Sequence, residues 1–266
     1  MSKPADPWHD FKSLTAARIA LGRAGGSLPT RELLDFGLSQ ARARDAVLAP
    51  FDAHSLIEQL NSAGLDTISL NSDASSREEY LRRPDLGRRL NSQSRDELAS
   101  LNSPSRDLCL IISDGLSSHA AVHAGEVVTA LTSLLKDEGW SIAPVVIIPF
   151  ARVAIQDEVG EGLKSAISLI LLGERPGLGS PDSLGAYFVY GPGPGRTDAD
   201  RNCISNIRPS GLPPAAAVMA LHYLLNAARH RRISGISLKD ERLLSDQVDL
   251  ASLDMQTPAA TDTFRD

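Results

Sequence analysis

Asp107-Leu108-Cys109-Leu110-Ile111-Ile112-Ser113-Asp114-Gly115 is the stretch that decides the fold class. Its apolar residues run without polar alternation, which is typical of a strand covered on both faces of a sheet. The run breaks at Asp114–Gly115, and an amphipathic helical pattern follows from about Ser117 to Gly139. The stretch therefore predicts a buried strand followed by a helix.

The same alternation continues toward the carboxyl terminus. Further strands are predicted over residues 145–150, 168–172 and 186–190, with a helix after the first of them and a late helix over 215–229. The order strand, helix, strand, helix, strand predicts an α/β protein with a Rossmann-like, doubly wound and mainly parallel sheet. Right-handed crossovers bring the strand-to-helix loops to one edge, where ligands bind in such sheets. We expect residues 114–117, 151–156 and 173–182 at that edge, with a loop over 191–209 covering them.

Residues before Pro104 are rich in Arg, Ser and Leu and show short helical patterns. Helices are predicted from Thr15 to Gly25, from Thr30 with Leu34, Leu38 and Ala41 on one stripe, and from Ser55 to Gly64. Capping-box spacing at Ser76–Glu79 and at Ser94–Glu97 predicts two more helix starts. We divide the chain into a helical amino-terminal region, residues 1–104, and an α/β domain, residues 105–266.

Composition excludes several classes of protein. The 266 residues are 42% apolar and 23% charged, and 27 basic against 33 acidic residues give a net charge of −6. This balance disfavours a nucleic-acid-binding protein. No apolar run approaches the ~20 residues that span a bilayer, so no membrane association is expected. The two cysteines, Cys109 and Cys203, are too few for a disulfide framework and favour the cytoplasm.

Two of the expected loops carry polar groups suited to ligand binding. Asp114-Gly115-Leu116-Ser117 could hold a hydroxyl or phosphate group, or could simply start the following helix. The second loop is Gly173-Glu174-Arg175-Pro176-Gly177. Its glycines let the backbone approach a ligand closely, and Glu174 and Arg175 supply a hydrogen-bond acceptor and a set of guanidinium donors. The alternative is a charged surface turn. Arg201–Asn206 adds hydrogen-bonding groups in a segment that we expect to be loop.

Catalytic and metal-binding patterns are missing. His119 and His123 stand four apart without a third ligand, so no metal site is predicted. Cys203 lacks a histidine base, and we expect no catalytic residue. The arginines at 82, 83, 88 and 89 form a solvated face, a subunit contact or a phosphate site. A ligand crevice without catalytic side chains suggests that a cofactor or a partner supplies the reactivity.

Seven segments, in order along the chain, resemble the small subunit of ethanolamine ammonia-lyase, an adenosylcobalamin-dependent enzyme. They are Thr15–Arg23 (TAARIALGR), Tyr80–Leu90 (YLRRPDLGRRL), Asp114–Ser117 (DGLS), Ala151–Ala154 (ARVA), Gly173–Leu178 (GERPGL), Ser180–Gly185 (SPDSLG) and Arg201–Ile207 (RNCISNI).

The resemblance implies a lyase subunit that is inactive without its large subunit. In this family the large subunit holds ethanolamine, and an adenosyl radical from adenosylcobalamin starts a reaction that yields acetaldehyde and ammonia. The small subunit's α/β domain closes over the corrin in a hetero-oligomer. The family's cobalamin contacts fall on Val153, Glu174 and Cys203, so residues 105–266 are expected to be the cobalamin-binding domain.

The resemblance also bears on location and on alternatives. It implies a cytoplasmic protein. Many relatives carry a long amino-terminal extension that is linked to packaging in a bacterial microcompartment, whereas the stretch before Thr15 is short here. Packaging of this protein is therefore an open question. Two other functions stay open. One is a nucleotide- or phosphate-binding regulatory module on a Rossmann-like sheet, and the other is a purely structural assembly protein.

Overall fold

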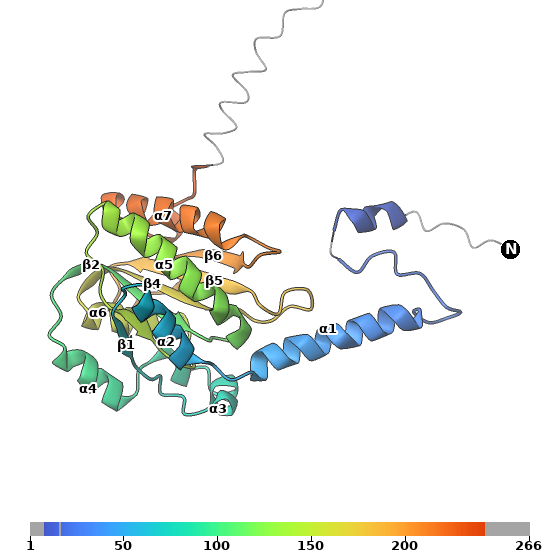
Figure 1. Ribbon diagram of the computed structural model, residues 1–266, viewed down its shortest axis with the longest axis horizontal. Helices are drawn as coiled ribbons and strands as arrows, with labels where there is room; N and C mark the ends of the chain where they lie inside the picture. The colour runs from blue at the N-terminus through green and yellow to red at the C-terminus, as the bar shows by residue number, and fades with distance from the viewer. Residues whose placement is uncertain (1–7, 16, 243–266) are drawn as a thin grey trace, which may run out of the picture.

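A computed structural model describes residues 8–15 and 17–242 (Figure 1). Its six-stranded sheet has the order β1-β3-β2-β4-β5-β6. The strands are β1 (Thr67–Ser69), β2 (Arg106–Ser113), β3 (Val145–Ile147), β4 (Ser165–Gly173), β5 (Leu184–Tyr190) and β6 (Arg201–Ile207). β1, β3, β2 and β4 pair in parallel, whereas β5 and β6 join as antiparallel strands. The predicted α/β class with a mainly parallel sheet is confirmed.

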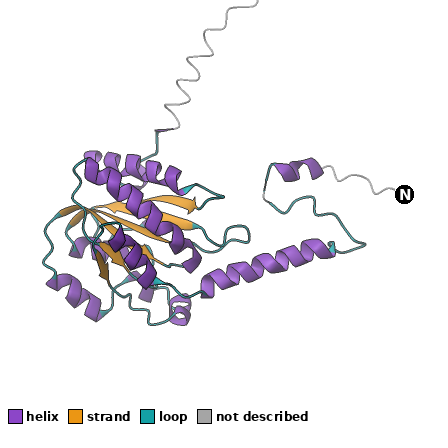
Figure 2. Ribbon diagram, viewed as in Figure 1, coloured by secondary structure: helices purple, strands orange, loops and turns teal. Residues whose placement is uncertain are grey.

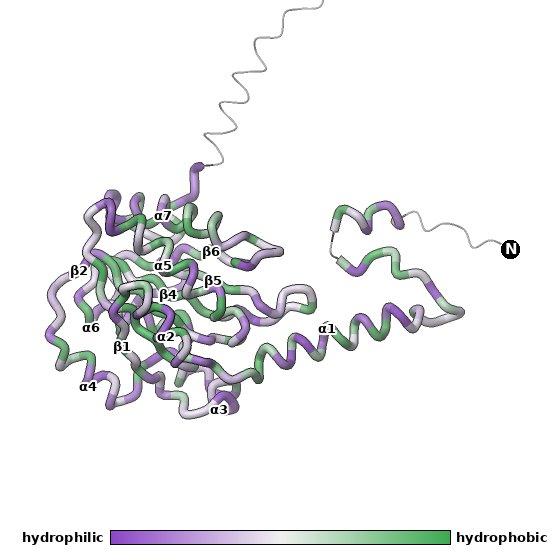
Figure 3. Tube along the Cα trace, viewed as in Figure 1, coloured by the Kyte–Doolittle hydropathy of each residue, from purple (hydrophilic) through white to green (hydrophobic). Residues whose placement is uncertain are grey.

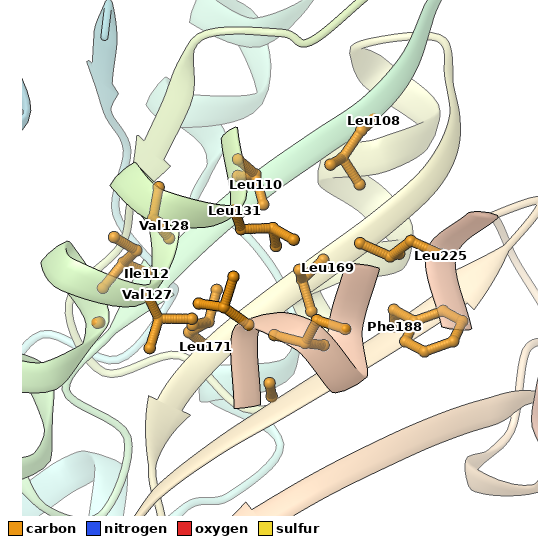
Figure 4. Close-up of a cluster of buried hydrophobic side chains, with 14 of the residues drawn as sticks. Leu108, Leu110, Ile112, Val127, Val128, Leu131, Leu169, Leu171, Phe188 and Leu225 are labelled. Carbon is orange, nitrogen blue, oxygen red and sulfur yellow. The ribbon is translucent and has the colours of Figure 1, made fainter. Parts of the chain in front are cut away.

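Helices cover both faces of this sheet (Figure 2). Alternate residues of β2 point to opposite faces: Leu108, Leu110 and Ile112 to one core cluster, Cys109 and Ile111 to the other. The first cluster packs against α2 (Ala53–Ser62), α5 (Ala121–Asp137) and α7 (Pro214–Arg231), as Figure 4 shows for α5 and α7. The second packs against α4 (Ser92–Ser100) and α6 (Ile155–Gly162). Burial on both faces explains why β2 reads as an unbroken apolar run.

The strand order positions a crevice. α5 lies in the connection from β2 to β3, and α6 lies in the connection from β3 to β4. Because β3 and β4 lie on opposite sides of β2, these two connections run in opposite directions along the sheet. The carboxyl end of β2 therefore lies at a topological switch point, where ligands bind in doubly wound sheets. The loops predicted for this edge follow β2, β3 and β4.

One predicted loop is a strand. Residues 201–206 belong to β6, which pairs antiparallel with β5 as an edge of the sheet. Its mostly polar sequence reads as loop because only Arg201 and Ile207 are buried. The side-chain amide of Asn202 donates to the carbonyl oxygens of Gly235 and Leu238 at 3.3 and 2.8 Å, which ties the strand to the segment after α7. The predicted loop over 191–209 is therefore wrong over residues 201–207.

The helix predicted from Thr15 to Gly25 is also wrong. Residues 17–23 have no regular structure, and a bridge between Ala24 and Ser27 closes a turn in which Gly25 has φ +64°. No residue of this segment is buried. A short helix without packing is marginal in water, which accounts for the difference. A short 3-10 helix precedes it over His9–Ser13.

The other amino-terminal helices largely agree with the sequence analysis. α1 (Thr30–Leu48) and α2 occupy the expected positions, and Ser76 caps α3 (Arg77–Arg82) by accepting from the Glu79 amide at 3.2 Å. The capping box at Ser94 is wrong, because Asn91 caps α4 instead and accepts from the Ser94 amide at 2.8 Å.

The boundary at Pro104 stays a prediction. β1 belongs to the same sheet as the later strands, and Leu56 of α2 and Leu98 of α4 join its two core clusters. α1 instead projects away from the sheet (Figure 1). In the part of the chain that the structure describes, every helix is too short or too polar to cross a membrane.

Candidate functional site

A pocket of about 420 Å³ opens at the switch point. It is formed by the loop after β2, the loop after β3, the end of β4 with the turn that follows, and side chains from α3 and β5. Its lining residues are Tyr80, Leu116, Arg152, Val153, Leu172, Gly173, Glu174, Arg175 and Tyr187. Val153 and Glu174 thus meet in one pocket, although they are 21 positions apart in the sequence.

The floor of the pocket is closely packed backbone. The Leu116 amide donates to the Gly173 carbonyl at 2.8 Å. A Cβ atom on Gly173 would lie 2.1 Å from the Ser117 carbonyl oxygen, and one on Gly115 would lie 2.4 Å from that of Gly173. Gly115 also has φ +50°, which favours glycine. Glycine at both positions lets the loop after β2 press against the end of β4.

Glu174 is fixed at the rim by donors from three directions. Its Oε2 accepts from the Ser183 hydroxyl at 2.5 Å and from the Asn206 amide at 3.1 Å, and its Oε1 accepts from the Tyr187 hydroxyl at 3.2 Å. Its own amide donates to the Ser183 carbonyl at 2.9 Å. The carboxylate therefore has a defined position between β4, β5 and β6, and its remaining lone pairs can accept hydrogen bonds from a ligand.

Cys203 is linked to this carboxylate by way of Tyr187. Tyr187 on β5 pairs with Cys203 on β6, and the Tyr187 hydroxyl donates to Glu174. Burial raises the pKa of Tyr187 far above its ordinary value, and Cys203 and Glu174 raise it further. Desolvation also raises the pKa of the Cys203 thiol, although that thiol remains solvent-accessible. Both groups are therefore protonated at neutral pH, and neither is an activated nucleophile.

The loop that carries Val153 is held in place by the Tyr80 ring of α3. The Arg152 guanidinium lies 4.2 Å from the centre of the Tyr80 ring, and the Tyr80 hydroxyl donates to the Ala151 carbonyl at 3.1 Å. Burial raises the pKa of Tyr80 to about 12. The loop after β3 is thus held by stacking and hydrogen bonding, with the partly buried Val153 facing the pocket.

Asp114 holds loops together rather than a ligand. Its buried carboxylate pairs with Arg77 and accepts from the Phe150 amide at 2.7 Å. Ser117 donates to the Pro181 carbonyl at 2.6 Å. The structure therefore favours the reading of Asp114–Ser117 as a turn that starts a helix.

Other candidates from the sequence are engaged locally. His123 Nε2 lies 3.6 Å from Asp182 Oδ2, and residues 8–15 and 17–242 contain no cluster of three or more side chains suited to a metal ion. In the arginine cluster, Arg83 pairs with Asp85 at 2.7 Å and Arg82 with Glu78 at 2.9 Å, all on the surface.

Three lining residues with polar groups, Arg152, Tyr80 and Tyr187, were not singled out as site residues from the sequence. Arg152 is adjacent to Val153 and could have been chosen for that reason. Tyr80 and Tyr187 could not, because their place in the pocket depends on how α3 and β5 pack against the loops.

Comparison with known proteins agrees with the resemblance. Residues 5–239 match the family described as "Ethanolamine ammonia-lyase light chain (EutC)". The "Ethanolamine ammonia-lyase small subunit" of Pseudomonas syringae pv. tomato is 50% identical over 246 residues, covering 91% of this chain and 86% of that protein. The protein of the same name from Rhodopseudomonas palustris is 48% identical over 249 residues, covering 92% and 95%.

Proposed function

The chain belongs to the ethanolamine ammonia-lyase light-chain family, and we propose that it forms one half of an adenosylcobalamin site that a large subunit completes. Together the two subunits convert ethanolamine to acetaldehyde and ammonia. The observation that carries the proposal is the meeting of Val153, Glu174 and the Tyr187–Cys203 pair at one edge of the sheet. These groups come from the loop after β3, the end of β4 and the two antiparallel strands.

The chemistry of the pocket fits a corrinoid. The edge of a corrin ring carries amide side chains, which donate hydrogen bonds, and Glu174 is a fixed acceptor for such a donor. Val153 and Tyr80 offer apolar contact surface in the pocket, and Cys203, which pairs with Tyr187 but does not itself line the pocket, offers an accessible neutral thiol beside it. A volume of about 420 Å³ holds only part of a cobalamin molecule, which fits a site that a second protein surface completes.

The residues of this chain bind and orient rather than react. Adenosylcobalamin, when bound, supplies the radical chemistry. Tyr187 and Cys203 are neutral at pH 7, and Glu174 is held by three donors. We assign none of them a proton or hydrogen transfer, and we expect this chain to depend on its large subunit for activity.

Reconstitution tests the proposal. The purified chain, the ethanolamine ammonia-lyase large subunit of the same organism and adenosylcobalamin are mixed, and acetaldehyde release from ethanolamine is measured. We expect activity only when all three are present. Deamination by this chain without the large subunit, or no effect of adding it to the large subunit, would contradict the proposal.

The regulatory alternative makes a separate prediction. A nucleotide- or phosphate-binding module binds a free nucleotide without a partner, and equilibrium dialysis of the chain with ATP or inorganic phosphate measures this directly. We expect no binding to the isolated chain.

We also propose that the complex works in the cytoplasm, where Cys109 and Cys203 stay free thiols; packaging in a microcompartment stays a prediction.

A further inference from the structure

α1 presents an apolar stripe that the described chain leaves uncovered. Leu34, Leu38, Ala41 and Leu48 recur at helical spacing on one side of the helix. The exposed fractions of the three leucines are 68%, 48% and 54%. Figure 3 shows hydrophobic positions along α1 where it extends away from the sheet. The sequence pattern that predicts an amphipathic helix is thus present without the surface that would bury it.

The preceding segment lies on a different side of α1. Arg18 stacks on the Phe36 ring at 5.7 Å and donates to the Ser39 hydroxyl at 2.6 Å. At 100° per residue, Phe36 and Ser39 lie roughly opposite the leucine stripe. The contact therefore leaves the stripe free.

Packing inside the chain does not account for this helix. Ala46 alone among the 19 residues of α1 is buried. Helices in proteins gain most of their stability from packing an amphipathic face, and exposed apolar surface gathered on one side of a helix often marks a site of protein interaction. Asp45 is the one charged residue between Ala41 and Leu48 on this side of α1. The stripe from Leu34 to Leu48 extends over roughly 21 Å of α1, which is long enough for a substantial protein contact.

The carboxyl-terminal end of α1 lies at the same edge of the sheet as the pocket lined by Val153 and Glu174, the proposed cofactor pocket. The Ser118 hydroxyl, in the segment after β2, donates to the Ala49 carbonyl at 2.8 Å. A second pocket of about 510 Å³ opens there, lined by Leu48, Phe51 and Phe150 among others. The centre of the Phe150 ring lies 6.1 Å from the centre of the Tyr80 ring, and Tyr80 lines the cofactor pocket. One partner can therefore contact both the pocket and α1.

We propose that the α1 stripe docks on the large subunit of ethanolamine ammonia-lyase; this inference rests on the proposed function. The family match begins at residue 5 and so includes α1, and the relatives named above are designated small subunits. α1 carries three arginines, Arg31, Arg42 and Arg44, against three acidic residues. Because these charges balance, the contact is driven by the leucines.

The test compares Leu38→Asp with Gln40→Asp in the full chain. Both positions are exposed on α1, both variants gain one negative charge, and Gln40 lies about 200° around the helix from Leu38. Affinity for the immobilised large subunit is measured by biolayer interferometry. We expect Leu38→Asp to bind at least about tenfold more weakly, with Gln40→Asp like the wild type. Leu34→Asp should repeat the loss, and circular dichroism should show all variants folded.

The outcomes separate the two proposals. Binding of Leu38→Asp and Leu34→Asp as tight as that of the wild type overturns the docking surface and leaves the proposed function intact. A wild-type chain that does not bind the large subunit overturns both. If light scattering shows that Leu38→Asp dissociates a dimer of this chain while binding to the large subunit is unchanged, the stripe pairs with a second copy, and the proposal is wrong.

Discussion

At the scale of single residues, Glu174 combines two roles. Its carboxylate ties the end of β4 to Ser183, Tyr187 and Asn206, and it faces the pocket with lone pairs to spare. The family motif and the position after a buried strand suffice to select it. The donors that orient it are not readable from the sequence, because Ser183 precedes β5, Tyr187 lies on β5 and Asn206 lies on β6, and only the folded sheet brings them together.

We predict that Glu174→Ala weakens cobalamin binding by the two-subunit complex by about 1–3 kcal/mol, through a lost buried hydrogen bond. Glu174→Gln keeps one acceptor oxygen and should lose less. Titration of each complex with adenosylcobalamin, followed by visible absorption, measures the effect. Unchanged affinity of the alanine variant would remove Glu174 from the cofactor site.

Gly173 makes a second prediction at this scale. A methyl group there meets the Ser117 carbonyl, so Gly173→Ala should destabilise the chain by about 1–3 kcal/mol and distort the pocket floor. Gly179→Ala is the matched control, since nothing lies within 4 Å of its added Cβ. Thermal unfolding of both variants decides the matter, and equal melting temperatures would show that the close approach is not required.

At the scale of elements, the sequence predicts strands best where burial is complete, and helices where apolar spacing extends over several turns. β2 is recognisable because both faces are covered, and α1 and α2 because their apolar spacing is helical, although α1 itself is almost entirely exposed. β6 is missed because an exposed edge strand has no apolar pattern to read. The segment at residues 17–23 is assigned wrongly because its helical spacing is short and has no surface to pack against.

β6 is held to the body of the protein by a buried ion pair. Arg201 Nη2 lies 2.7 Å from Asp157 Oδ2 on α6, and the two side chains are 3% and 13% exposed. Desolvation raises the pKa of Asp157, and the charge of Arg201 opposes that rise. Removing the arginine leaves a buried carboxylate without its partner.

We therefore expect Arg201→Met to cost about 3–5 kcal/mol of unfolding free energy, measured by urea denaturation. Arg196→Met breaks a half-exposed pair with Asp200 and should cost less than about 1 kcal/mol. Equal losses in the two variants would mean that the Arg201–Asp157 pair does not hold β6 in place.

Asp107 links three elements and gives a pH dependence. Its carboxylate accepts from the Ser141 amide and hydroxyl at 2.8 and 2.7 Å and lies 3.3 Å from Arg229 on α7. Partial burial works to raise the pKa of Asp107, but the Ser141 hydrogen bonds and Arg229 together hold that pKa below its ordinary value. The carboxylate is therefore better stabilised in the folded chain than in the unfolded one.

Because the folded-state pKa is depressed, the carboxylate contributes stability above its unfolded pKa of about 3.9 and loses it as the pH falls through the folded value. Asp107→Asn should be less stable by about 1–2 kcal/mol at pH 7 and approach the wild type below about pH 4. Urea denaturation across this range measures the difference, with the exposed Glu97→Gln as control. A difference that does not shrink with falling pH would contradict this account.

At the scale of the whole molecule, the chain has the form of an incomplete binding site. The sheet places Val153, Glu174 and Tyr187 at one edge, in a pocket that holds only part of a large ligand, and Cys203 lies next to Tyr187 on β6. α1 leaves the same edge and projects outward with its leucines uncovered. Both features have the same physical explanation if a second subunit covers this side of the molecule.

A cryo-electron microscopy map of the complex with the large subunit and adenosylcobalamin tests this claim most directly. We predict density for the corrin ring between the two subunits, in contact with Val153, Glu174 and Cys203. A corrin enclosed entirely by the large subunit, with the pocket of this chain facing solvent, would contradict the account.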